Sequence, residues 1–113
     1  MEVRSGALFS PHDSEVYTSF VSSLPAVFLR NFRRHETVRK IEIGHYVSTM
    51  ALHRNLVLLG TADRLILVLQ DATVKETLVG HSDSVAALVS YEGVLVSCSG
   101  GEIIKWQPPA LHL

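Results

Sequence analysis

The sequence between residues 44 and 107 contains one pattern twice. Residues 44–70 read GHYVSTMALHRNLVLLGTADRLILVLQ, and residues 80–107 read GHSDSVAALVSYEGVLVSCSGGEIIKWQ. Each copy begins with Gly-His and continues with three short apolar runs that are separated by turn residues. The two Gly-His pairs lie 36 residues apart, and self-similarity at such a period indicates a repeat architecture.

The apolar runs of both copies predict short β-strands. Residues 56–59, 65–69 and 94–96 are apolar without alternation, which is typical of strands buried on both faces. Residues 74–79 alternate and indicate a half-exposed edge strand, whereas residues 85–89 and 103–106 complete the second copy. The expected class is therefore all-β.

The pattern resembles the WD-repeat β-propeller family over residues 38–107. In that family each repeat is a four-stranded unit that opens near Gly-His and closes near Trp-Asp. The resemblance implies a partial WD-repeat β-propeller with about two four-stranded blades. Because propellers have about 4–8 blades, the expected ring is incomplete.

In the family a His, a Ser or Thr, an Asp and a Trp of one repeat form a buried hydrogen-bonded set. By resemblance, the first copy supplies His45, Thr61 and Asp63, with Leu69 in the Trp position. The second copy supplies His81, Cys98 in the Ser/Thr position, Gly100 in the Asp position, and Trp106. Ser97 or Ser99 would replace Cys98 if the strand shifts by one residue.

The flanking regions are less regular than the two copies. Residues 1–37 form a divergent N-terminal segment with strand-like runs near 15–21 and 27–32, which is either a degenerate repeat or an unrelated leader. Residues 38–107 hold the two WD-like repeats. Residues 108–113 form a C-terminal tail, because Pro108-Pro109 stops strand formation.

The composition excludes several classes of protein. The 113 residues carry a net charge of −1, so no overall field favours nucleic acid or a membrane surface. Neither a basic segment followed by an apolar core nor an apolar run long enough to span a bilayer occurs, so a cytoplasmic or nuclear location is expected. The single cysteine rules out an intramolecular disulfide framework.

Catalysis, cofactors and metals are not expected. The run from His81 to Ser84 contains the three residue types of a hydrolase triad, but triad members must meet in space, which adjacency in sequence opposes. The six histidines show no metal-ligand spacing with a Cys or carboxylate set. The protein is therefore expected not to be an enzyme.

A basic cluster that includes Arg30, Arg33 and Arg34 has two interpretations. It could bind an acidic or phosphorylated ligand, because guanidinium groups grip such oxygens in pairs. The favoured interpretation is a solvated loop between two strands, which is the commoner meaning of a charge run.

The expected function is that of a non-enzymatic protein–protein interaction element in a WD-repeat scaffold or adaptor. The alternative is a truncated or alternatively started isoform without an autonomous fold, which docks into or competes with a full propeller. Either way, the exposed surface of an incomplete ring predicts self-association or a protein partner that completes the propeller.

Overall fold

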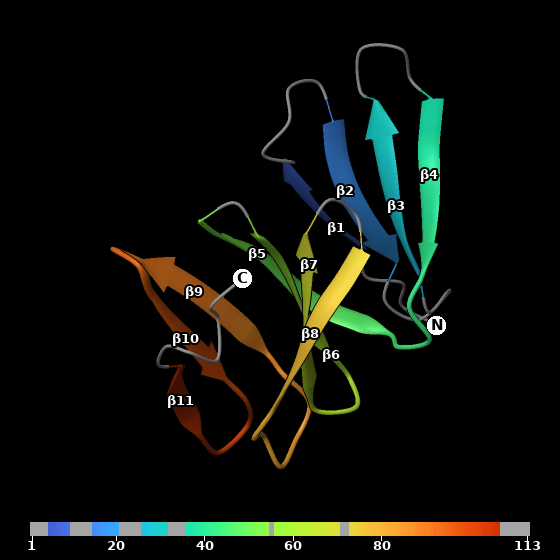
Figure 1. Cartoon of the computed structure of the whole chain (residues 1–113). Helices are drawn as coiled ribbons and strands as arrows, with labels where there is room; N and C mark the ends of the chain where they lie inside the picture. Colours follow the sequence, from blue (N-terminus) through green and yellow to red (C-terminus); the bar gives the residue numbers. More distant parts are fainter. Residues whose placement is uncertain are drawn as a thin grey trace.

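The computed structural model describes residues 5–9, 15–20, 26–31, 36–54, 56–70 and 73–106, with side chains for residues 26–27 and from residue 40 onward. Every regular element in these residues is a β-strand, so the predicted all-β class is confirmed. The strands form three antiparallel sheets that follow one another along the chain (Figure 1).

The first sheet pairs its four strands in sequence order: β1 (Ser5–Phe9), β2 (Glu15–Phe20), β3 (Ala26–Asn31) and β4 (Glu36–Glu42). Most of it lies within residues 1–37, which contain no Gly-His pair. The expectation of about two four-stranded units therefore understates the number of sheets, which is three in the described residues. Antiparallel pairing joins backbone groups, so a strand can pair without the Gly-His motif.

The second sheet contains β5 (Val47–His53), β6 (Leu56–Thr61), β7 (Leu65–Gln70) and β8 (Thr73–Val79), again in sequence order. All six residues of β6 are buried, as are the middle four residues of β7. This confirms the prediction that residues 56–59 and 65–69 are strands covered on both faces.

The third sheet has three strands, with β10 (Val94–Cys98) between β9 (Ala87–Tyr91) and β11 (Ile103–Trp106). Glu92 and Gly93 connect β9 to β10 with positive φ values of 48° and 78°, as a tight hairpin turn requires. Among the described residues, β11 is an edge strand with no neighbour on its outer side. The strand predicted at residues 85–89 is shifted, because β9 begins only at Ala87.

Val85 precedes β9 and connects the third sheet to the second sheet. Its side chain is fully buried and its N–H donates to the Thr61 carbonyl at 3.1 Å. A Cβ at Gly60 would lie 2.8 Å from Val85 Cγ1 and 2.6 Å from Thr49 Cγ2. Only glycine leaves room at Gly60 for this close contact between the sheets.

The three sheets stack face to face, with β5 lying beside both β1 and β9 (Figure 1). Val27 and Ile41 of the first sheet join a core cluster with one face of the second sheet, which includes Val57 and Leu67. The other face of the second sheet, which includes Leu58 and Ile66, forms a second cluster with Leu95 of the third. Thus the second sheet is covered on both sides.

Candidate structural site at His81

His81 lies in the segment that leads from β8 of the second sheet into the third sheet, and it is only 7% exposed. The preceding Gly80 lets the backbone approach the third sheet closely, because a Cβ there would lie 3.1 Å from the Trp106 ring and 3.3 Å from Ile104. The Gly-His pair therefore places the imidazole against the side chains of β10 and β11.

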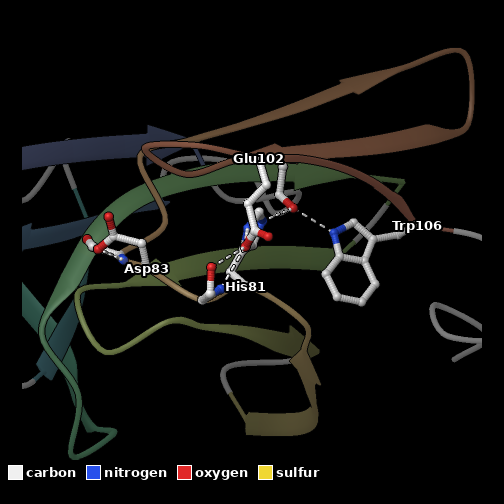
Figure 2. Close-up of polar contacts among 7 residues, drawn as sticks. His81, Asp83, Glu102 and Trp106 are labelled. Carbon is white, nitrogen blue, oxygen red and sulfur yellow. Dashed lines mark hydrogen bonds and ion pairs between the residues drawn. The ribbon is translucent and has the colours of Figure 1, made fainter.

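Four side chains are joined in a continuous series of hydrogen bonds (Figure 2). Trp106 Nε1 donates to Ser97 Oγ at 2.7 Å, and Ser97 Oγ lies 2.5 Å from His81 Nε2. On the other side of the ring, His81 Nδ1 lies 3.1 Å from Glu102 Oε1. We call Trp106, Ser97, His81 and Glu102 the His81 network.

The number of protons available sets the direction of each bond in the His81 network. A serine hydroxyl has one proton to donate and two lone pairs that accept. Since Trp106 donates to Ser97, the Ser97 proton is free to go to His81 Nε2, and the imidazole proton then lies on Nδ1 and goes to Glu102. In this tautomer every group of the His81 network has a partner, as burial of polar atoms requires.

Glu102 also fixes the loop that follows His81. The Ser82 N–H donates to Glu102 Oε1 at 2.7 Å, and the Ser82 hydroxyl lies 3.3 Å from the same oxygen. The bond from the Ser82 N–H lowers the pKa of Glu102; partial burial raises it, and the bonds from His81 and the Ser82 hydroxyl lower it further. The carboxylate thus remains ionised and can accept all of these bonds.

The first copy forms a smaller and more exposed set. His45 Nδ1 lies 2.5 Å from Asp63 Oδ2, but the two side chains are 30% and 52% exposed. Partial burial raises the pKa of Asp63, but hydrogen bonding to Thr61 and His45 and the charge of His45 outweigh it, so the pKa is lowered. Contrary to the resemblance-based expectation, this pair is not buried, and such exposed pairs contribute little to stability.

The two remaining residues of the first copy are buried, and Thr61 has a backbone partner besides Asp63. Thr61 is fully buried and its hydroxyl accepts from the Leu65 N–H at 2.9 Å, across the turn between β6 and β7. Leu69, in the position of the family Trp, is buried in the first core cluster and has no side-chain N–H that could donate a hydrogen bond. The first copy therefore lacks the series of bonds seen at His81.

The structure brings His81 and Trp106 together but replaces the two residues that the resemblance placed between them. The hydroxyl is that of Ser97 rather than the thiol of Cys98, and the carboxylate is that of Glu102, where Gly100 had been expected. The one-residue shift to Ser97 was an open alternative, whereas Glu102 was missed. The sequence feature that points to Glu102 is its position directly after the Gly100-Gly101 turn.

The basic cluster has no described side chains. Arg30 lies in β3 with only its backbone described, and Arg33 and Arg34 lie outside the described residues. Binding of an acidic ligand at this cluster stays a prediction. In the part of the chain that the structure describes, no group of three or more His, Cys, Asp or Glu could hold a metal ion. The same residues contain no helix long and apolar enough to cross a membrane.

A second buried histidine links the second and third sheets directly. His53, at the end of β5, is 2% exposed, and its Nδ1 lies 2.7 Å from Ser90 Oγ of β9. Burial lowers the pKa of His53, and the positive charge of the adjacent Arg54 lowers it further. His53 is therefore neutral in the folded protein at neutral pH.

Stability is expected to fall as the pH drops below the usual histidine value of 6.5. There the unfolded chain binds a proton at His53 and the folded chain does not, so the unfolded state gains stability. Urea midpoints at about pH 7.5 and about pH 5.5, at one protein concentration, measure this effect. The drop should be smaller in His53→Gln, which keeps the other five histidines. Equal drops in both proteins would contradict the assignment.

Comparison of the chain with protein-family models found no match, and comparison with curated proteins found no significant match.

Proposed function

We propose that this chain is a non-enzymatic protein–protein interaction element built on the plan of WD-repeat proteins. The observation that supports this best is the His81 network, in which Trp106, a hydroxyl, His81 and a carboxylate are bonded in series. These are the residue types that the WD-repeat resemblance implies, with Glu102 in place of an aspartate. The network joins the segment after β8 to the third sheet, so its role is to hold sheets in place.

The same geometry argues against catalysis at this site. Ser97, His81 and Glu102 have the order of a nucleophile, a base and an acid, as in a serine hydrolase triad. However, Ser97 is 0% exposed and its oxygen already accepts from Trp106. A substrate carbonyl must reach the nucleophile, but the Ser97 hydroxyl is enclosed by the protein interior.

The surface of the third sheet supports a binding role. The strand β9 exposes Val89 and Tyr91, and β11 exposes Ile103, which is 75% accessible. Contiguous exposed apolar groups of this kind mark sites of protein contact. We infer that partners bind through this sheet, in the manner of a scaffold or adaptor.

Affinity capture from cell extract tests the interaction role. Tyr91→Asp removes a 71% exposed apolar side chain from the third sheet, and Val79→Asp is the matched control at a 73% exposed position of β8. Proteins retained by the wild type and by Val79→Asp should be lost with Tyr91→Asp. Retention of no protein, or equal retention by all three baits, would contradict the proposal. So would an ester, peptide or phosphate hydrolase activity that disappears in Ser97→Ala.

A further inference from the structure

The third sheet has one covered and one open face. On the covered face, Leu95, Ser97 and Trp106 meet the second sheet. Strand register places eight residues on the opposite face: Ala87, Val89, Tyr91, Val94, Val96, Cys98, Ile103 and Lys105. We call these eight residues the open face. Seven of them are uncharged and largely apolar, and Val89, Tyr91 and Ile103 are 53%, 71% and 75% exposed.

The core of the equivalent face of the second sheet is covered. Leu58 lies 36 residues before Val94, and Ile66 lies 37 residues before Ile103, which are the spacings of the repeat. Leu58 and Ile66 are 0% exposed, because the third sheet packs on them. The open face is thus built from the same kind of residue at the same positions, but no sheet covers it in the described residues. We expect a further sheet to pack on the open face, as the third sheet packs on the second.

The stacking order of the chain indicates which sheet fits. The first sheet packs on the second through Val27 and Ile41, and the second packs on the third through its opposite face. The first strands of the three sheets repeat this order, because β5 lies beside both β1 and β9. Continuing the order beyond β9 places a strand equivalent to β1 next, and the first sheet of another copy offers such a strand.

We propose that two copies of this chain associate head to tail, with the open face of each covered by the first sheet of the other. Two sets of three sheets make a ring of six, which lies within the range of about 4–8 blades for closed propellers. The two contacts are identical and related by a two-fold axis, so a heterologous contact closes without forming a filament. This inference rests on the proposed WD-repeat-like plan and names the partner of the open face as a second copy.

Light scattering coupled to size exclusion tests the stoichiometry of the 113-residue chain. The wild type should have twice the chain mass of 12.5 kDa. Ile103→Lys places a charge on the open face, at a 75% exposed position of the edge strand β11, and should weaken the dimer by at least about tenfold, because an unpaired charge is costly to bury. Val79→Lys, at the 73% exposed position of β8, should remain dimeric. Circular dichroism should show the same strand content for all three proteins.

Three outcomes would overturn the six-sheet ring: a monomeric wild type, a species larger than a dimer, or a dimer that Ile103→Lys leaves intact. Cys98 distinguishes the two possible dimers, because it is the only cysteine and lies on the open face. In the head-to-tail ring it faces the first sheet of the other copy, so mild oxidation should give no covalent dimer. A Cys98–Cys98 disulfide would show that two open faces pack on each other instead.

The outcomes also separate this inference from the proposed function. A monomer that still captures a protein through Tyr91 would leave the interaction role standing and remove the ring. A dimer that fails to bind any other protein would leave the ring standing and limit the partner to a second copy.

Discussion

Ser97→Ala is expected to destabilise the protein strongly. The substitution leaves the Trp106 N–H and His81 Nε2 without their shared partner, and Ser97 is too deeply buried for water to take its place. A buried polar group without a partner costs about 1–3 kcal/mol, and two groups are affected here. The free energy of unfolding in urea, at fixed protein concentration, measures the loss.

Ser99→Ala is the matched control two residues along the chain. The Ser99 hydroxyl is buried without a hydrogen-bond partner in the described part of the protein. Its removal should be neutral or slightly stabilising, since no bond is lost. Cys98→Ala should also leave the His81 network intact, because Cys98 lies on the opposite face of β10. If Ser99→Ala or Cys98→Ala proves the most damaging of the three changes, the register of β10 is wrong.

Leu58→Ala should have the largest effect in the hydrophobic core. Leu58 is 0% exposed in β6 and belongs to the cluster that joins the second and third sheets. Truncating a buried leucine removes its transfer free energy and leaves a cavity, which together cost about 2–5 kcal/mol. The unfolding free energy and the thermal midpoint both report this change.

Val79→Ala provides the comparison for Leu58→Ala. Val79 is 73% exposed on β8, so its truncation should change the unfolding free energy by no more than about 0.5 kcal/mol. Comparable losses in the two variants would mean that the face carrying Leu58 is not covered by the third sheet.

The His81 network was predictable only in part. The Gly-His pair and Trp106 were recognisable from the repeat, because their residue types and spacing are unusual in a short apolar sequence. Ser97 could not be separated from Cys98 or Ser99, because a one-residue register shift moves every side chain to the other face of a strand. Glu102 was missed because the geometry of the turn before β11 decides which carboxylate reaches His81 and the Ser82 N–H.

The site of the first copy was also predictable only in part. His45 and Asp63 do approach each other, at the spacing that the repeat implies. Their exposure could not be read from the residues, because burial depends on which other segments pack on them. Leu69 stands in the indole position and packs into the core instead.

By itself, the amino-acid sequence determined the all-β class, the two-fold repeat and the position of most strands. These follow from local properties, namely apolar runs of three to five residues between turn residues, and they hold wherever the strands finally pack. The first sheet was harder to recognise, because its strands pair through backbone groups and carry no Gly-His motif.

Only the tertiary structure decided which apolar faces are covered. Leu58 and Val94 occupy equivalent positions in consecutive repeats and are both aliphatic, yet Leu58 is fully buried and Val94 is partly exposed. The difference arises because the third sheet packs on Leu58, whereas in the described residues no sheet packs on Val94. Burial is a property of two surfaces in contact, so the residues of one strand cannot specify it alone.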